Sequence, residues 1–417
     1  VTESKPDTAV STSAEVLGAV DGTRFEMAVP FPDNAVLWDF EQPFLYMVRV
    51  QLVIDGTLVD RFDDRTGLRT AGIRGDQFTL NEKLFLPRLV FGNHTAKPSN
   101  WDLDRLVPWI EGIRARNYTL YRNHVSPMSR YWYLIADQVG LPAICQCCMP
   151  SPPKDDFDHP HWRNWLADVE RMIRQNGNCP SVFMWSPENE MLSASKHIDA
   201  DGTLHEKLGE ILDHFHRLDN RPVTFEGDGH LRGRCETYNE HYPHRYGDYL
   251  WPVDYYYLNV PHIPNNADMR HHYGRINLKS LGIPIIFGET MWFPTGGPIA
   301  DAAFTGDKVY EWFRKYPHHN WKVLDGLNKY DMIARAYNLQ KVAAFVIQTS
   351  GALSHDIEMH YNNPLAVFLK EEHRQYFGGD PLTRTYVICN GTTADRTLTV
   401  NASVQADGRT LAQKTAT

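Results

Sequence analysis

The sequence is poor in cysteine, has no long apolar run and carries no excess of positive charge. Six cysteines in 417 residues are too few for a scaffold held by disulfides. No run of about 18 apolar residues is present, so the sequence offers no candidate transmembrane helix. The net charge of -9 comes without a block of like charges, which argues against nucleic acids and anionic membranes as partners. The remaining composition, 42% hydrophobic and 22% charged, is typical of a globular protein.

The first ten residues, VTESKPDTAV, also lack the basic and apolar regions of a signal peptide. The compartment therefore stays open, and secretion or a periplasmic location is compatible with the sequence. The oligomeric state stays open too, a homo-oligomer included.

Signatures of bound cofactors and metals are missing as well. Neither a Gly-x-Gly-x-x-Gly fingerprint nor a Walker loop is present, and a nucleotide-binding open sheet requires one of them. Cys145, Cys147 and Cys148 lie close together, but no second pair of ligands stands at zinc spacing. We therefore expect these cysteines to be small buried hydrophobic residues, and we expect neither a metal nor an organic cofactor.

Residues 1–84 carry strand patterns only. The segment Leu45–Ile54 alternates in hydrophobicity, and Asp55-Gly56 then provides a tight turn before a returning strand. A second strand pairing is predicted within GDQFTLNEKLFL, with its turn at the Asn-Glu pair. These patterns predict a β-sandwich.

From residue 85 to residue 374, short apolar strands alternate with amphipathic helices. One helix is predicted in WDLDRLVPWIEGIRARN, with Leu103, Leu106 and Ile110 on its apolar stripe. The eight predicted strands are RLVFGNH, TLYRNH, LPAICQ, SVFMWS, PVTFEGD, CETYNEHY, IPIIFGE and AAFVIQ. This alternation predicts a (β/α)8 barrel. A doubly wound open sheet is the alternative, but it would need the phosphate-binding loop that is missing.

From residue 375 to residue 417 strand alternation returns, with a turn at Asp407-Gly408. These few strands cannot close a sandwich. We therefore expect a partial third β domain, and a chain that is a fragment of a longer protein.

Carboxylates, amides, imidazoles and aromatic rings follow the predicted barrel strands. Because barrel active sites are built at the carboxyl ends of the strands, these are the candidate site residues. They are Asn93, His94, Arg122, His124, Gln146, Asn189, Glu190, Glu226, Asp228, Glu240, His241, Tyr242, Glu289, Trp292 and Gln348. No Cys–His or Ser–His set stands at a strand end. The inventory suits glycoside hydrolysis, which needs an acid, a second carboxylate and polar groups for the sugar hydroxyls.

The two best placed carboxylates are Glu190 and Glu289. Each follows an apolar strand, and the fourth and seventh strands of a barrel face each other across its mouth. Glu188 is the rival of Glu190, and we favour Glu190 because Asn189 precedes it. For either glutamate alone, the structural alternative is a first-turn helix residue or a salt bridge at the rim.

Several segments resemble glycoside hydrolase family 2. LWDFEQPFLYMVRV, followed by GLRT, GDQFTLNEK and GNH, resembles the junction between the immunoglobulin-like domain and the barrel of that family. CPSVFMWSPENE resembles its acid/base strand, and IPIIFGE its nucleophile strand. The resemblance implies an immunoglobulin-like β-sandwich over residues 1–84, a catalytic barrel over 85–374 and a partial C-terminal β-sandwich over 375–417.

The resemblance also implies a retaining mechanism. Glu190 would be the general acid and then the base, and Glu289 the nucleophile. Asn189 would donate to the sugar 2-hydroxyl, while Arg122 and Tyr242 would keep Glu289 ionised and oriented.

Five further residues are implied to line the sugar pocket. His94, His124 and His241 match pocket positions of the family, although a single histidine at a strand end is as often structural as ligand-binding. Trp292 follows the nucleophile strand as a sugar platform or a packing ring. Gln348 stands where a tryptophan is common, so we expect a different pocket floor.

The activity that the resemblance implies is an exo-acting β-glycosidase, with β-galactosidase first and β-mannosidase, β-glucuronidase or a polysaccharide-specific enzyme behind it. Its substrate would be an oligosaccharide or polysaccharide. The second hypothesis is an endo-acting hydrolase of the same clan, in which rings such as Trp251 and Tyr255 would line a groove. A non-catalytic carbohydrate-binding protein is the third. A retaining site should hold its carboxyl groups about 5 to 5.5 Å apart, and an inverting site about 6.5 to 9.5 Å.

Overall fold

The computed structural model describes residues 34–92, 102–125, 128–147, 156–192, 198–241, 264, 266–289, 342–346, 359, 362–369, 378–381 and 383–417. Within these ranges, no helix combines the length and the apolar character needed to cross a membrane.

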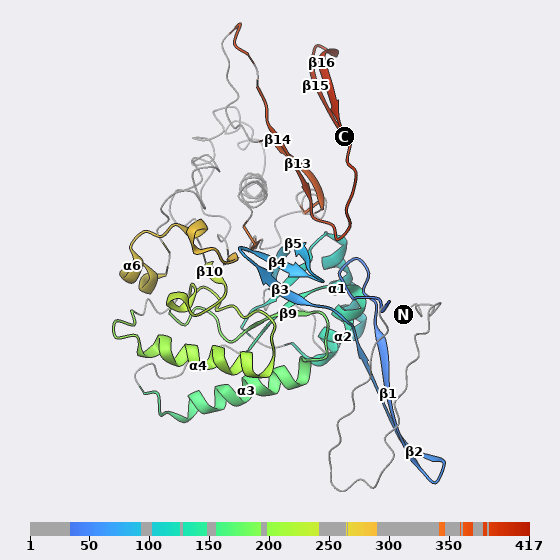
Figure 1. The fold of residues 1–417 in the computed structure, drawn as a ribbon, viewed down its shortest axis with the longest axis vertical. Coiled ribbons are helices and arrows are strands. Elements are labelled where there is room, and N and C mark those ends of the chain that lie inside the picture. Colours follow the sequence, from blue (N-terminus) through green and yellow to red (C-terminus); the bar gives the residue numbers. More distant parts are fainter. Residues whose placement is uncertain are drawn as a thin grey trace, which may run out of the picture.

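A parallel sheet of seven strands lies at the centre of the molecule (Figure 1). Its strands are β6 (Arg88–Gly92), β7 (Leu120–Asn123), β8 (Ala143–Gln146), β9 (Val182–Ser186), β10 (Tyr238–His241), β11 (Ile285–Glu289) and β12 (Ala344–Val346). The spatial order is β10-β11-β12-β6-β7-β8-β9, so the last strand pairs with the first. Parallel strands in chain order, with the last beside the first, are the arrangement of a (β/α)8 barrel.

The fifth predicted strand, residues 222–228, is not a regular strand. It lies between β9 and β10 in the sequence and makes isolated bridges, Val223 with Trp185 and Glu226 with Asn189. Gly229 has a φ of +75°, a left-handed conformation that ends an extended segment. The hydrogen-bonded ladder therefore does not close around the sheet within the described residues.

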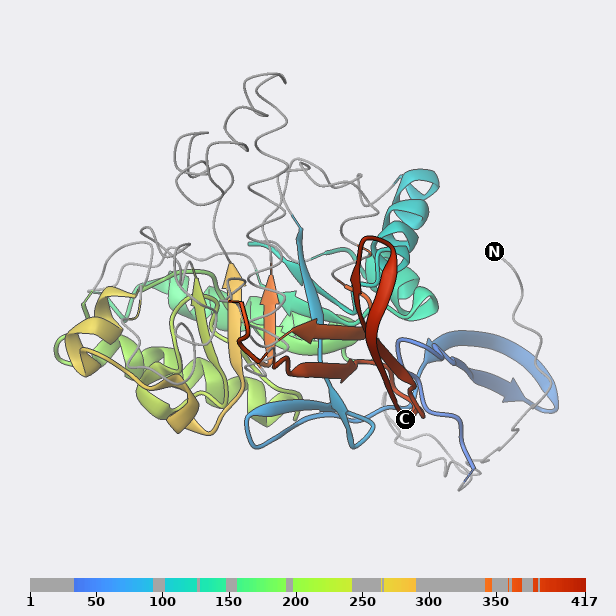
Figure 2. The ribbon, with the colours of Figure 1, turned by 90° about the horizontal axis from the view of Figure 1, so that it is seen from above.

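Helices cover the outside of the sheet (Figures 1 and 2). They are α1 (Leu103–Ala115), α2 (Arg130–Val139), α3 (Pro160–Asn176), α4 (Thr203–Leu218) and α6 (Ala267–Tyr273), with 3-10 turns η1 (Leu231–Gly233) and η3 (Leu278–Leu281). The predicted apolar stripe of α1 is buried at Leu106 and Ile110, but Leu103 is 48% exposed because it begins the helix. Cys145 and Cys147 are buried free thiols, as predicted, whereas Cys148 lies outside the described residues.

A small antiparallel sheet packs against the barrel. It consists of β3 (Ala71–Arg74), β4 (Gln77–Leu80) and β5 (Lys83–Phe85), and the turn predicted at Asn81-Glu82 is confirmed by left-handed φ angles at both residues. The rings of Phe78 and Phe85 lie 5.6 and 5.0 Å from that of Phe183 near the start of β9. This sheet therefore covers the amino ends of the barrel strands, opposite the ends that carry the candidate site.

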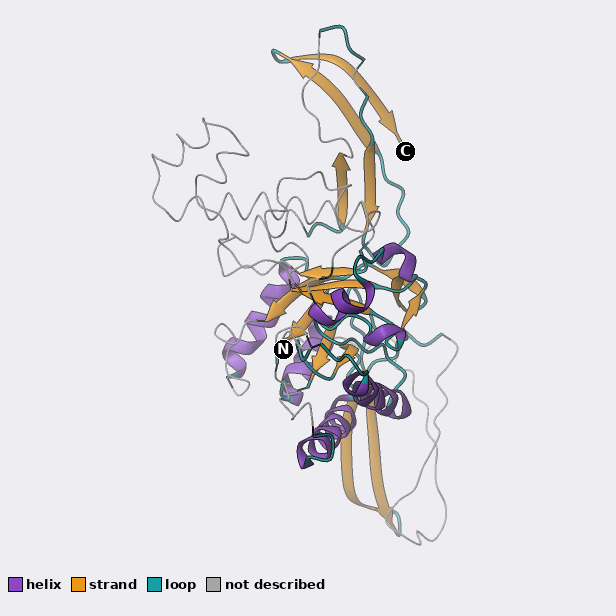
Figure 3. Ribbon diagram, turned by 90° about the vertical axis from the view of Figure 1, so that its left-hand side faces the viewer, coloured by secondary structure: helices purple, strands orange, loops and turns teal. Residues whose placement is uncertain are grey.

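The β1–β2 hairpin (Tyr46–Ile54 and Thr57–Thr66) turns at Asp55-Gly56, as predicted. The face expected to be buried is not covered by any described residue: Leu52 is 52% and Ile54 53% exposed. At the other end of the chain, antiparallel pairs form between β13 (Leu365–Leu369) and β14 (Tyr386–Asn390), and between β15 (Val400–Ala406) and β16 (Arg409–Ala416). These pairs and the β1–β2 hairpin project in opposite directions from the central part of the molecule (Figure 3).

Candidate active site

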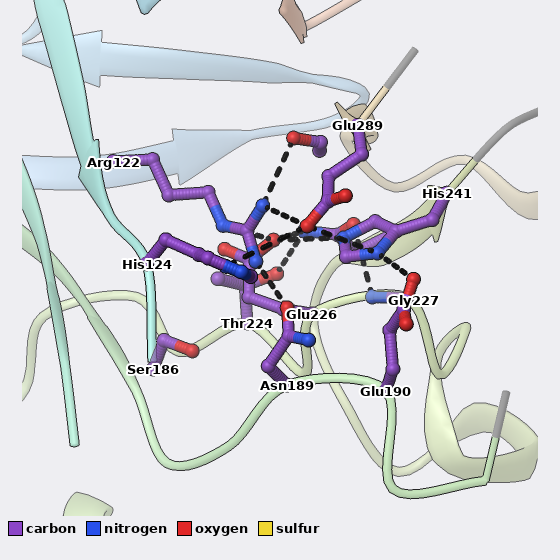
Figure 4. A network of polar contacts seen from close by, with 12 residues as sticks. Arg122, His124, Ser186, Asn189, Glu190, Thr224, Glu226, Gly227, His241 and Glu289 are labelled. Atoms are coloured by element: carbon purple, nitrogen blue, oxygen red, sulfur yellow. Dashed lines mark hydrogen bonds and ion pairs between the residues drawn. The ribbon is translucent and has the colours of Figure 1, made fainter. Parts of the chain in front are cut away.

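Polar side chains from different strands meet at the carboxyl end of the sheet (Figure 4). Ten of the fifteen candidate residues are described. Seven of these ten meet here: Arg122, His124, Asn189, Glu190, Glu226, His241 and Glu289. The other five candidates, Asn93, His94, Tyr242, Trp292 and Gln348, lie outside the described residues.

Glu289 is held by a buried cation. It is the last residue of β11, and its Oε1 accepts a 2.8 Å hydrogen bond from Nη1 of Arg122 on β7. The same Nη1 donates to the Gly288 carbonyl at 3.2 Å. Burial opposes the charge of Arg122, but the carboxylates of Glu226 and Glu289 outweigh it and raise the pKa of Arg122. His124 Nδ1 lies 3.6 Å from the same Glu289 oxygen, so a guanidinium and an imidazole face this carboxylate.

Asn189 is oriented by the other end of the guanidinium. Arg122 Nη2 donates to the Asn189 Oδ1 atom. An amide has one acceptor end and one donor end, so this contact directs the NH2 group of Asn189 away from Arg122 as a donor.

Glu190 has an unusual backbone. Its φ is +53°, a left-handed conformation that non-glycine residues seldom adopt. Its amide donates a 2.7 Å hydrogen bond to the carbonyl of Glu226. The side chain is 17% exposed and directs Oε1 to within 2.6 Å of His241 Nδ1.

His241 lies among three carboxylates. Its fully buried ring lies 2.6 Å from Glu190, 3.5 Å from Glu226 and 3.6 Å from Glu289. Burial opposes a charge on the ring, but the carboxylates outweigh it and raise the pKa of His241 to about 9. The imidazole therefore carries a proton on both nitrogens at neutral pH.

Glu226 is one of the candidate residues at the strand ends, but the sequence assigned it no role. Its fully buried carboxylate accepts a 2.8 Å hydrogen bond from Asn239 Nδ2. Arg122 Nε lies 3.1 Å from the same Oε2 atom, as an ion pair rather than an aligned hydrogen bond. The available signal was its place at the end of PVTFEGD, beside the predicted strand ends.

The structure also separates Glu190 from its rival Glu188. The Glu188 side chain is fully buried, and its Oε2 accepts from the Met191 amide at 3.1 Å. Burial and the nearby charge of Asp228 raise the pKa of Glu188 well above its ordinary value. Glu190, rather than Glu188, therefore faces His241 and the site.

Three of these side chains also have a spacing that a metal ion could bridge. Glu190, His241 and Glu289 each offer a ligand atom, and these atoms lie within 4.8 Å of one another. Arg122 already supplies a cation to Glu289, however. We assign no metal to this trio.

Comparison with known proteins identifies the barrel. The model of the family "Glycosyl hydrolases family 2, TIM barrel domain" matches residues 71–262. The β-galactosidase BgaC of Bifidobacterium adolescentis is 28% identical over 222 residues, which are 48% of this chain and 20% of that protein. A β-galactosidase of Psychromonas ingrahamii is 26% identical over 219 residues, 51% of this chain and again 20% of the relative. The matched segment thus spans a fifth of the length of these curated relatives.

Solved structures share the fold. A family 2 β-galacturonidase from Eisenbergiella tayi, bound to galacturonate, superposes with a TM-score of 0.60 at 14% identity, over 82% of this chain and 62% of that one. A β-glucuronidase from Ruminococcus gnavus in complex with D-glucuronic acid gives a TM-score of 0.53 at 20% identity, over 76% of this chain and 52% of that one. The barrel segment of the chain, residues 71–262, is thus similar to the TIM barrel domain of glycosyl hydrolases family 2.

Proposed function

We propose that the protein is a retaining β-glycosidase that releases terminal β-linked sugars, with Glu190 as acid/base and Glu289 as nucleophile. The observation that carries this proposal is the approach of two carboxylates at the carboxyl end of the barrel, where one oxygen of each lies within 4.8 Å of the other. Such closeness supports a retaining site, since an inverting site keeps its carboxyl groups about 6.5 to 9.5 Å apart to admit a water.

The first half of the reaction forms a glycosyl ester. An oxygen of Glu289 attacks the anomeric carbon, the glycosidic bond breaks, and the leaving oxygen takes a proton from Glu190. Arg122 and His124 face Glu289, which holds the attacking carboxylate in place. His241 Nδ1 lies 2.6 Å from Glu190 Oε1, which orients the carboxyl group that gives the proton.

The second half hydrolyses the ester. Water attacks the anomeric carbon while Glu190 takes one of its protons, and the bond to Glu289 breaks, which restores both carboxyl groups. The NH2 group of Asn189, turned away from Arg122, donates to the sugar 2-hydroxyl.

The sugar we expect first is β-linked galactose, because both curated relatives are named β-galactosidases. The domain arrangement is part of the same proposal: an immunoglobulin-like sandwich over residues 1–84 and a partial β-sandwich over 375–417. The antiparallel pairs β1–β2, β13–β14 and β15–β16 support it.

The alternatives are less well supported. A carbohydrate-binding protein without activity needs no pair of carboxylates joined through a buried arginine and histidine. The rings that favoured an endo-acting groove, such as Trp251 and Tyr255, lie outside the described residues.

The test is hydrolysis of a panel of aryl β-glycosides by the wild type, Glu190→Gln and Glu289→Gln. Glu111→Gln, an exposed change on α1, is the matched control. We expect release from the galactoside, a loss of about 10²- to 10⁴-fold for Glu190→Gln, a larger loss for Glu289→Gln and none for the control. Full activity in either site variant would contradict the assignment.

A further inference from the structure

We propose that Glu226 is a positioning residue for both catalytic glutamates: its carboxylate fixes Arg122 and His241, and its main-chain carbonyl fixes Glu190. The inference rests on the proposed function and adds to it a third carboxylate that does not react with the sugar.

The first connection runs through Arg122 to the nucleophile. Arg122 Nε lies 3.1 Å from Glu226 Oε2, and Nη1 lies 2.8 Å from Glu289 Oε1. The rigid planar guanidinium is thus held between two carboxylates. All three side chains are buried, so little water screens these charges and the orientation of Arg122 depends on both anions.

The second connection runs through His241 to the acid/base. The ring places Nε2 3.5 Å from Glu226 and Nδ1 2.6 Å from Glu190. Because Nε2 of His241 faces Glu226, Nδ1 on the other side of the ring points at Glu190. The charged groups that act on the ring are the carboxylates of Glu190, Glu226 and Glu289 and the Arg122 guanidinium.

The third connection is through the main chain. The Glu226 carbonyl accepts a 2.7 Å hydrogen bond from the Glu190 amide, where the backbone is left-handed. Glu226 therefore anchors the backbone of Glu190 at the point where it is strained.

Two glycines make room for this arrangement. A Cβ atom at Gly288 would lie 2.6 Å from Glu226 Oε2 and 2.9 Å from His241 Nε2. A Cβ atom at Gly227 would lie 2.9 Å from His241 Nδ1 and 3.1 Å from Glu190 Cγ. The backbone on both sides thus packs directly against the contacts of Glu226, which points to a site built around this carboxylate.

The test compares Glu226→Gln with Glu226→Asp, using kcat, KM and the pH profile of kcat/KM on the best aryl glycoside. Glu188→Gln, a fully buried glutamate whose carboxyl faces the Met191 amide, is the control. For Glu226→Gln we expect kcat to fall by about 10²-fold, the loss typical of misplaced reacting groups, with a smaller change in KM. The basic limb should move to lower pH, since one of the anions that raise the pKa of His241 is gone.

Glu226→Asp keeps the charge, so its basic limb should stay near that of the wild type while kcat falls. Wild-type kcat and an unmoved basic limb in Glu226→Gln, with Glu190→Gln and Glu289→Gln inactive, would overturn the inference and leave the proposed function intact. Activity in the latter two variants would instead overturn the proposed function. If Glu226→Gln does not fold, Glu226→Asp decides: a lower kcat with an unmoved basic limb supports the inference, and wild-type kcat contradicts it.

Discussion

Glu190 combines a strained backbone with a directed side chain. A left-handed φ of +53° costs a residue with a Cβ atom roughly 1 to 2 kcal/mol. The hydrogen bond from its amide to Glu226 and the contact of its carboxylate with His241 hold it there. The conformation brings the carboxylate to the histidine that also contacts Glu289.

Because of this strain, we expect Glu190→Gly to be more stable than Glu190→Ala. Both Glu190→Ala and Glu190→Gly remove the carboxylate and its activity, but only glycine adopts a positive φ without strain. We expect the glycine variant to have the higher free energy of unfolding, by about 1 kcal/mol, in urea titrations. An alanine variant of equal or greater stability would show that the backbone at Glu190 is not strained.

We also expect Gly227→Ala to disturb the site. The new Cβ atom would lie 2.9 Å from the His241 ring, so we expect loss of activity as well as of stability. Gly233→Ala is the control, because Gly233 also has a positive φ but its Cβ would have nothing within 4 Å. The two should lose similar backbone stability, about 1 kcal/mol, and only Gly227→Ala should lose kcat. Equal kcat in both would argue against the tight packing at His241.

At the scale of elements, strands β6 to β12 and helices α1 to α4 follow from short apolar runs and apolar stripes in the sequence. The sequence pattern also predicts a strand over residues 222–228. Gly227 in this segment and Gly229 just after it have left-handed φ angles, however. The sequence alone does not reveal which glycines adopt such angles. The strand-end rule found Arg122 and Glu289. The role of Glu226 was missed, because its contacts arise from this irregular backbone.

The segment after β9 should make stability depend on pH. Burial and Asp228 hold the pKa of Glu188 above its unfolded value of about 4.3, so the folded state keeps a proton that the unfolded state releases. The contribution of Glu188 to stability is therefore lost as pH rises from about 4.3 toward the folded pKa, by up to about 1.4 kcal/mol per pH unit. Glu188→Gln should flatten the fall in the free energy of unfolding between about pH 5 and 7. Parallel curves for the variant and the wild type would contradict the raised pKa.

At the scale of the whole molecule, the barrel separates stability from chemistry. Phe183 packs with Phe78 and Phe85 at the amino ends of the strands, whereas Glu190 and Glu289 lie at the carboxyl ends. Sequence patterns predicted the barrel and its amino-terminal strands, but not that β3 to β5 would share its core.

This separation predicts how Phe183→Ala behaves. The side chain is 1% exposed, so its loss should cost about 3 to 5 kcal/mol in the free energy of unfolding. The protein that remains folded should keep the KM and the pH profile of the wild type. Urea titration and steady-state kinetics below the unfolding transition measure both, and a shifted pH profile would mean that the two ends are coupled.

The proposed retaining mechanism requires that Glu289 becomes covalently bound to the sugar. Its most direct test is mass spectrometry of the protein after reaction with an aryl β-glycoside of the preferred sugar that carries fluorine at C2, which slows hydrolysis of the ester. We predict a glycosyl group on the peptide that contains Glu289, absent in Glu289→Gln. A protein that turns over the ordinary substrate but forms no adduct, or forms it on another carboxylate, would contradict the account.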